Sequence, residues 1–151
     1  MKQTFFQAGN DWTGFVARTS LGLLILPHGL QKAFGLFGGY GFTGTMQYFT
    51  DFIRIPWLLG AFIIFAEVVG ALSLIAGLAT RFWSVVIIAL MLGTIITVHG
   101  KFGFFMDWGA NMAGEGYEYH LSIIVLSLLL ILNGAGKFSI DRKIASLPAV
   151  K

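Results

Sequence analysis

Long apolar segments alternate with short polar stretches along this chain of 151 residues. The segments cover approximately residues 12–33, 57–80, 82–99 and 118–136. A helix rises about 1.5 Å per residue, so about 20 apolar residues span a hydrocarbon core of about 30 Å. The pattern therefore predicts an all-α, polytopic membrane protein in which residues 1–151 form a single domain, a four-helix transmembrane bundle.

The stretch between the first two segments follows a different pattern. From Thr45 to Ile55, apolar residues recur at helical spacing and polar residues occupy the other positions. The apolar set is Met46, Phe49, Phe52 and Ile53, and the polar set is Gln47, Thr50, Asp51 and Arg54. The polar face excludes a full span, so we expect a short helix that lies in the membrane interface.

The composition supports a membrane protein, because 56% of the residues are hydrophobic and only 11% are charged. The absence of cysteine excludes a disulfide, a thiolate metal site and a Cys-ligated iron–sulfur cluster. The net charge of +3 comes from basic residues at segment ends, so we expect no nucleic-acid partner. The first residues lack a basic start that leads into an apolar run and a cleavage site, so no signal peptide is expected.

The distribution of basic residues predicts the orientation. Four spans place both termini on one side, together with the turn between the second and third segments. That side carries Lys2, Arg81, Lys137, Arg142, Lys143 and Lys151. The opposite side carries Lys32, Arg54 and Lys101 together with Asp51, Asp107, Glu115 and Glu118. The positive-inside rule then places the N- and C-termini in the cytoplasm.

Glu67 is the single charged residue of the second segment and lies near its middle. A charge at that depth costs at least about 2.5–3.5 kcal/mol, so Glu67 is a candidate functional residue. Arg18, in the inner third of the first segment, is the expected partner, because a guanidinium suits a bidentate pairing with a carboxylate. The pair could be a structural clamp that specifies helix register. The alternative is that Glu67 is protonated or exchanges protons.

A second group of polar residues is expected near the non-cytoplasmic surface. It comprises His28, Lys32, His99, Glu118 and His120. At 100° per residue, Lys32 shares a helix face with Arg18, Gly22, Ile25 and Gly29. Together with Glu67 and Arg18, this group could bind a ligand or relay protons, or the histidines could simply cap helix ends. The histidines form no short-spacing ligand motif, so no metal site is expected.

Aromatic residues mark the loop before the fourth segment. Phe104, Phe105 and Trp108 are expected either to cover the outer end of the bundle or to form the lid of a flat, apolar ligand pocket.

These features together resemble the DoxX family of small four-helix bacterial membrane proteins. The resemblance extends from Arg18 to Asp141. It is carried by HGLQKAFG (28–35), AEVVGALSLIAGLATR (66–81), GFFMDWG (103–109), GEGYEYHL (114–121) and GAGKFSID (134–141). It implies a multi-pass protein of the bacterial cytoplasmic (inner) membrane with a link to redox chemistry, since relatives include a subunit of a thiosulfate:quinone oxidoreductase.

Two functions are therefore expected, and the sequence does not decide whether the protein is an enzyme. The first is a redox- or respiration-associated subunit that binds a quinone or similar lipophilic ligand near Glu67 and Arg18. No intrinsic cofactor motif is evident, so electron transfer would require a redox partner protein. The alternative is a non-catalytic membrane scaffold or assembly partner of a redox or stress-response complex. A proton-coupled transporter ranks last, because inverted repeats are not evident. Glycines on several segments also allow a homodimer.

Overall fold

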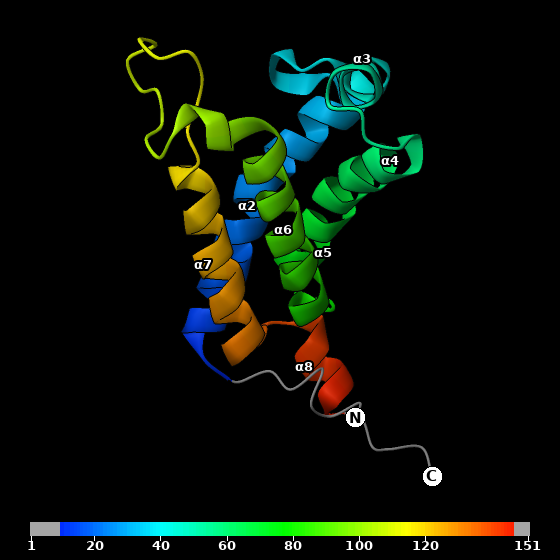
Figure 1. Ribbon diagram of the computed structural model, residues 1–151. Helices are drawn as coiled ribbons and strands as arrows, with labels where there is room; N and C mark the ends of the chain where they lie inside the picture. The colour runs from blue at the N-terminus through cyan, green and yellow to red at the C-terminus, as the bar shows by residue number, and fades with distance from the viewer. Residues whose placement is uncertain (1–9, 147–151) are drawn as a thin grey trace.

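The structure, a computed structural model, describes residues 10–146 and is helical without a strand in that range (Figure 1). The long helix α2 (Trp12–Phe34) is followed by the 3₁₀ turn η1 (Leu36–Gly38) and by α3 (Gly41–Gln47), which continues into the π-helical η2 (Tyr48–Phe52). Next, α4 (Trp57–Phe65), the π-helical η3 (Ala66–Gly70) and α5 (Ala71–Ala76) form one continuous helix.

The second half of the chain contains the remaining helices. The helix α6 (Thr80–Thr94) continues through the π-helical η4 (Ile95–His99) into the 3₁₀ turn η5 (Gly100–Phe102). After the 103–117 loop come α7 (Glu118–Asn133) and the short α8 (Ile140–Ala145). The sequence pattern did not predict α8.

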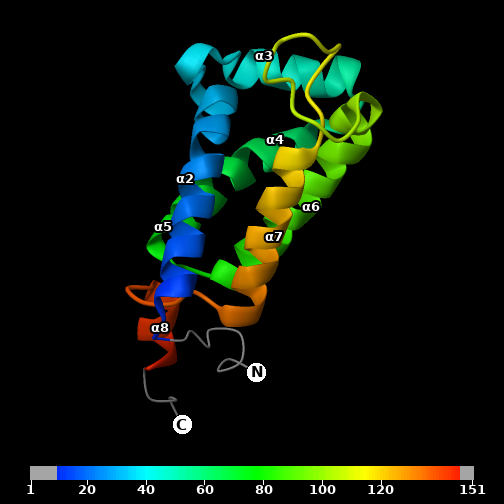
Figure 2. The ribbon, with the colours of Figure 1, turned by 90° about the vertical axis from the view of Figure 1, so that its left-hand side faces the viewer.

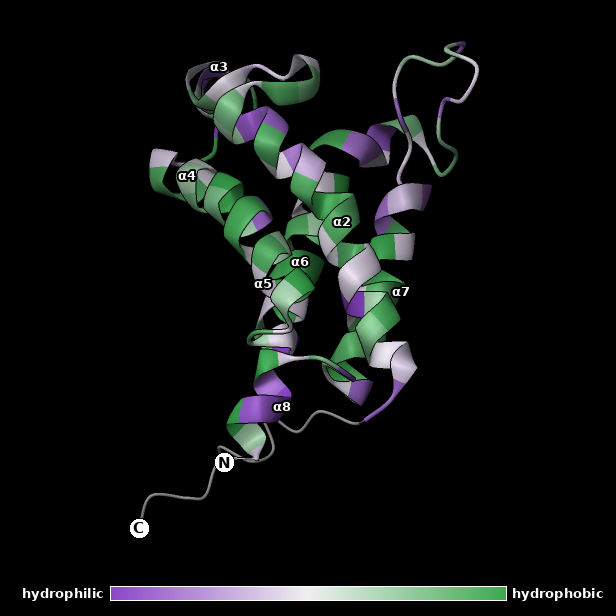
Figure 3. Ribbon diagram, turned by 180° about the vertical axis from the view of Figure 1, so that it is seen from behind, coloured by the Kyte–Doolittle hydropathy of each residue, from purple (hydrophilic) through white to green (hydrophobic). Residues whose placement is uncertain are grey.

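The long helices run side by side and define two ends of the molecule (Figures 1 and 2). The α3 end comprises residues 36–52 and 100–117, with α3 lying across the bundle in Figure 2. The α8 end comprises α8 and the connections at 77–79 and 134–139. Hydrophobic residues dominate the long helices, whereas hydrophilic residues gather in α8 (Figure 3).

The helix boundaries lie close to the expected segment ranges, but two segments end earlier than expected. The second ends at Ala76 instead of Thr80, because Gly77 adopts a left-handed conformation with φ of +69° and caps α5. The fourth ends at Asn133 instead of residue 136, where Gly134 has a φ of +80°. The expected interfacial helix begins at Gly41 instead of Thr45 and ends at Phe52.

Two of the described helices are long and apolar enough to cross a membrane, Trp57–Ala76 and Thr80–Phe102. The apolar helix Glu118–Asn133 is shorter. The polar residues of α2, among them Arg18 and Lys32, keep that helix outside this group although it has 23 residues. The expected lack of a signal peptide and the charges of Lys2 and Lys151 concern residues outside the described range.

Close packing holds α2 against the continuous helix α4–η3–α5. A Cβ atom on Gly22 would lie 2.7 Å from the carbonyl oxygen of Ala71, and one on Gly29 would lie 2.9 Å from the backbone of Glu67 and Val68. Such contacts are possible only for glycine, which lets two helix backbones approach closely. The face of α2 predicted from the sequence is therefore the face that packs, and Gly22 and Gly29 set its position along α5.

Candidate functional site

Glu67 forms an ion pair with Lys32 in the interior of the protein. The Lys32 ammonium group donates to both carboxylate oxygens of Glu67, at 2.7 Å and 3.0 Å. The side chain of Glu67 is 9% exposed, whereas that of Lys32 is 27% exposed. The carboxylate is therefore buried, and its partner reaches it from the side of the α3 end.

The expected pairing of Glu67 with Arg18 is wrong. Gly29 packs against the backbone of Glu67, and Arg18 precedes Gly29 by 11 residues, which corresponds to about 16 Å along the helix axis. The expectation assumed that the first two segments begin and end at the same depth. In the structure, α2 is shifted along α5, so Lys32 and not Arg18 reaches the level of Glu67.

Arg18 instead binds backbone carbonyl groups at the α8 end. Its guanidinium has five N–H donors, and all five are used. The acceptors are the carbonyl oxygens of Ala135 (2.8 Å), Leu74 (3.1 Å), Ile75, Lys137 (3.0 Å) and Phe138 (3.0 Å). Two of them are carbonyls of the last turn of α5, where Leu74 also accepts from the capping N–H of Gly77 at 3.0 Å. Arg18 is 1% exposed and has no N–H left for Glu67 or for a ligand. Its role is therefore structural, and it lies at the α8 end and not beside Glu67 as expected.

Asp141 completes this arrangement at the start of α6. Its carboxylate accepts from the backbone N–H groups of Ala79 (2.6 Å) and Thr80 (2.9 Å), and it interacts electrostatically with Arg18. A carboxylate at a helix N-terminus satisfies unpaired N–H groups and complements the helix dipole. The α8 end is thus joined by one buried arginine and one buried aspartate.

Glu67 lies within the π-helical segment η3, between α4 and α5. Insertions of this kind interrupt the regular α-helical hydrogen bonds and occur frequently at functional sites. Figure 1 shows that α4 inclines away from the direction of α5 at this point. The inclination carries α4 towards α3, which it contacts.

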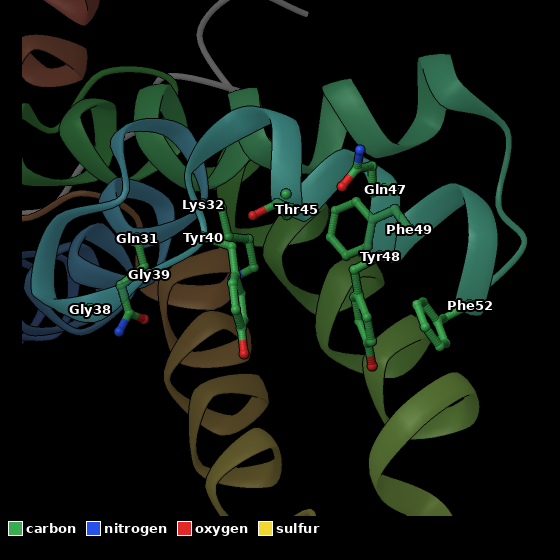
Figure 4. A pocket seen from close by; sticks show the side chains of 11 residues that line it. Gln31, Lys32, Gly38, Gly39, Tyr40, Thr45, Gln47, Tyr48, Phe49 and Phe52 are labelled. Carbon is green, nitrogen blue, oxygen red and sulfur yellow. The ribbon is translucent and has the colours of Figure 1, made fainter.

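A cavity of about 620 Å³ lies at the α3 end beside the ion pair. Its walls come from the end of α2, from the glycine-rich 38–44 stretch and from α3–η2. The side chains of Tyr40, Tyr48 and Phe52 project to the same side of this segment (Figure 4). Lys32 lines the cavity and also contacts Glu67, so a single side chain connects the cavity with the buried carboxylate.

The three histidines come from different helices and converge near the α3 end. The rings of His99 and His120 have centroids 4.4 Å apart, and His28 lies 6.0 Å from the ring of Tyr119. His120 interacts electrostatically with both of the other histidines. No group of three or more His, Asp or Glu side chains in residues 10–146 is placed to hold a metal ion.

Tyr119 is a member of this cluster that the sequence reasoning missed. Its ring lies 5.9 Å from that of His120, and it interacts electrostatically with Glu67. A neutral phenol between Glu118 and His120 carries no charge that would mark it within an apolar segment. The Tyr119 hydroxyl and the His120 Nδ1 atom are buried and have no hydrogen-bond partner within the described part of the chain. An unsatisfied buried polar group costs about 1–3 kcal/mol.

The remaining predicted residues organise the 103–117 loop. Glu118 accepts a hydrogen bond from the backbone N–H of Met106 at 3.0 Å, which ties α7 to the loop. Phe104 packs edge-to-face against Phe105 at 5.1 Å, and Trp108 is 86% exposed. None of the three aromatic residues belongs to the cavity wall, and their role as a lid stays a prediction.

Comparisons with known proteins identify the family to which this chain belongs. The DoxX family model matches residues 14–100. The chain is 30% identical over 130 residues to the inner membrane protein YphA of Escherichia coli (strain K12), which covers 85% of this chain and 87% of YphA. It is 30% identical over 124 residues to CatD of Bacillus subtilis (strain 168), named provisionally as an oxidoreductase, covering 82% of this chain and 81% of CatD. No solved structure matches. The chain therefore belongs to the DoxX family of membrane proteins.

Proposed function

We propose that this protein is a redox- or respiration-associated subunit that binds a quinone or similar lipophilic ligand in the cavity at the α3 end. The observation that supports the proposal is the double contact of Lys32, which lines the cavity and pairs with the buried Glu67. The site is therefore centred on Glu67 and Lys32, and Arg18 is not part of it.

The lining of the cavity fits such a ligand. Ligand pockets usually measure about 300–1,000 Å³ and combine apolar walls with a few polar groups. Here Phe49 and Phe52 supply apolar surface, and the rings of Tyr40 and Tyr48 combine an apolar face with a phenol group. A quinone head presents two carbonyl oxygens and a flat ring, which match an ammonium donor and aromatic walls.

Within this site, Lys32 would donate a hydrogen bond to a ligand carbonyl, and Glu67 would hold the ammonium group in position. A bound quinone would supply the electron-accepting chemistry. In this arrangement the electrons would come from a redox partner protein. The provisional oxidoreductase name of CatD supports this role for a relative of the chain.

The proposal includes a membrane arrangement. Four spans, α2, α4–η3–α5, α6–η4 and α7, would place the α8 end in the cytoplasm and α3–η2 flat in the opposite interface. The α8 end carries Lys137, Arg142 and Lys143, and Arg81 lies next to it in the first turn of α6, as the positive-inside rule requires. The name of YphA supports a bacterial inner-membrane location. A homodimer is also compatible with this arrangement.

Thermal unfolding of the purified protein in lipid nanodiscs tests ligand binding. A ubiquinone with one isoprenoid unit, at about 100 times its Kd, should stabilise the wild type by about 2.7 kcal/mol. Lys32→Gln and Glu67→Gln should fold and lose this stabilisation. Lys101→Gln is the matched control, because Lys101 lies over the ring of Phe102 at the same end, outside the cavity wall.

The result that contradicts ligand binding is equally specific. If the quinone shifts neither the wild type nor any variant, and Glu67→Gln lowers only stability, the ion pair is a structural element. The non-catalytic scaffold alternative then becomes the better account.

A further inference from the structure

We propose that Tyr119 and His120 form a proton route between Glu67 and the surface of the α3 end at His99. The inference deepens the proposed function, on which its biological purpose rests, because quinone reduction consumes protons. The route itself is a property of this chain alone, and it is tested without a quinone.

The residues of the route follow one another in space. The Tyr119 ring lies 6.0 Å from that of His28, and Gly29, the next residue of α2, packs against the backbone of Glu67. Tyr119 also interacts electrostatically with Glu67. The ring of Tyr119 lies 5.9 Å from that of His120, and the rings of His120 and His99 lie 4.4 Å apart. Four side chains from three helices thus connect the interior of the bundle with its α3 end.

Two buried atoms on this line have unused hydrogen-bonding capacity. His120 is 7% exposed, and its Nδ1 atom, like the Tyr119 hydroxyl, has no partner within residues 10–146. A phenol hydroxyl both donates and accepts, and an imidazole can take a proton on one nitrogen and release it from the other. Water that bridges such groups satisfies them and conducts protons. Both atoms are therefore placed to act as relay points.

The outer end of the route opens towards the loop. The Nδ1–H group of His99 donates to the carbonyl oxygen of Glu115 at 2.7 Å. This bond assigns the proton of neutral His99 to Nδ1 and leaves its Nε2 as an acceptor. Glu115 is exposed, so its contact with His99 lies at the surface, where His99 can take up a proton from solvent. The proton can then pass from His99 to the neighbouring His120.

The opposite direction is closed by an apolar layer. Between Glu67 and the α8 end, four helices contribute buried apolar side chains at 0–2% exposure, namely Leu21, Ile25, Leu74, Ile87 and Ile123. Proton exchange is thus confined to one end. When Tyr119 passes a proton to Glu67, Tyr119 is reprotonated from His120, His120 from His99, and His99 from solvent. The protonation states of these three groups are then restored, and no oxidant or reductant is needed.

Several charged and titratable groups face this route. They are His28 from α2, which interacts electrostatically with His120, Lys32 from α2, which pairs with Glu67, and Glu118 from α7, which directly precedes Tyr119. Lys32 holds the carboxylate of Glu67, and Glu118 is engaged by the N–H of Met106, so neither takes the place of Tyr119 or His120 in the route.

Rapid-mixing infrared spectroscopy of the full chain in quinone-free lipid nanodiscs tests the route. The carboxyl band of Glu67 is identified as the band that Glu67→Gln lacks, and its deuteration rate is followed after transfer to D₂O. Tyr119→Phe, His120→Leu and His120→Gln should each slow this rate by about 10²-fold, the low end of the contribution of a positioned proton-transfer group. Tyr117→Phe, which removes a phenol hydroxyl two residues from Tyr119, should exchange at the wild-type rate.

Three results would overturn the inference. One is a wild-type rate in Tyr119→Phe and the His120 variants. Another is full recovery in His120→Gln, which keeps a hydrogen bond but cannot carry a proton, because recovery would indicate a structural role. The third is that Glu67 shows no protonated band at any pH at which the protein is folded. If the variants at one of the two positions, Tyr119 or His120, fail to fold, the exchange rates of the variants at the other position decide the test. A quinone that fails to bind contradicts the proposed function and leaves these rates unaffected.

Discussion

The ammonium nitrogen of Lys32 lies 2.7 Å from a carboxylate oxygen of Glu67, although 35 residues separate the two in the chain. This ion pair is asymmetric, because the carboxylate is buried and the lysine is partly exposed. An unpaired Lys32 could extend towards the surface, whereas an unpaired Glu67 would remain inside the bundle. Removing one partner therefore has a different consequence from removing the other.

Removal of Lys32 should destabilise the protein more than removal of Glu67. Lys32→Met leaves an uncompensated buried carboxylate, and breaking a buried pair in this way costs about 3–5 kcal/mol. The loss should shrink at low pH, because a protonated carboxyl group has no charge to bury. Unfolding of Lys32→Met, Glu67→Gln and the wild type between pH 4 and pH 8, about the range in which carboxylates and histidines titrate, measures both effects. A larger loss in Glu67→Gln would contradict this asymmetry.

Arg18 should resist even its most conservative replacement. Arg18→Lys keeps the charge but has three donors in place of five and lacks the planar geometry that reaches five carbonyl groups. We expect a loss of at least about 3 kcal/mol in unfolding free energy, since hydrogen bonds to charged groups contribute about 1.5–3 kcal/mol each. Arg142→Lys, at an exposed arginine that bonds to Asn10, should change stability by only about 0.5 kcal/mol. Equal effects at the two positions would refute the structural role of Arg18.

The glycines of α2 and α6 should respond in opposite ways to the same substitution. Gly29→Ala places a methyl group 2.9 Å from the backbone of Glu67 and Val68, and such overpacking costs about 1–3 kcal/mol. It should also separate Lys32 from Glu67. Gly93→Ala meets no atom within 4 Å and should stabilise its helix by about 0.5–1 kcal/mol. Thermal unfolding of both variants makes the comparison, and a neutral Gly29→Ala would mean that α2 and η3 are not in close contact.

The helices could be located from the sequence because the apolar segments are long and the breaks between them contain glycine. Helical spacing also placed Arg18 and Lys32 on one face of the first segment, and in the structure the glycines of that face pack against η3 and α5. Which of these two cations meets Glu67 depends on the shift of α2 along α5. That shift is set by the contacts of Gly22 and Gly29, which no pattern within a single helix reveals.

Other parts of the site were missed for different reasons. The carbonyl groups that bind Arg18 belong to helix ends and a turn, and backbone acceptors are the same in every sequence. Tyr119 is neutral and follows another tyrosine, Tyr117, by two residues, so only its position near Glu67 and His120 distinguishes it. The cavity is lined by the end of α2 and by residues between 38 and 52, so it depends on how these two segments fold against each other. The π-helical segment η3 also leaves no clear signature in the apolar pattern.

Double-mutant cycles of Lys32→Gln with Glu67→Gln and of Arg18→Gln with Glu67→Gln, measured by reversible unfolding in the same lipid mixture, test the central claim most directly. Residues in contact show coupling energies of about 0.5–3 kcal/mol, whereas distant residues add within about 0.3–0.5 kcal/mol. The structure predicts clear coupling between Lys32 and Glu67 and additive effects for Arg18 and Glu67. Coupling of Glu67 to Arg18 and not to Lys32 would contradict the account and move the buried carboxylate away from the cavity.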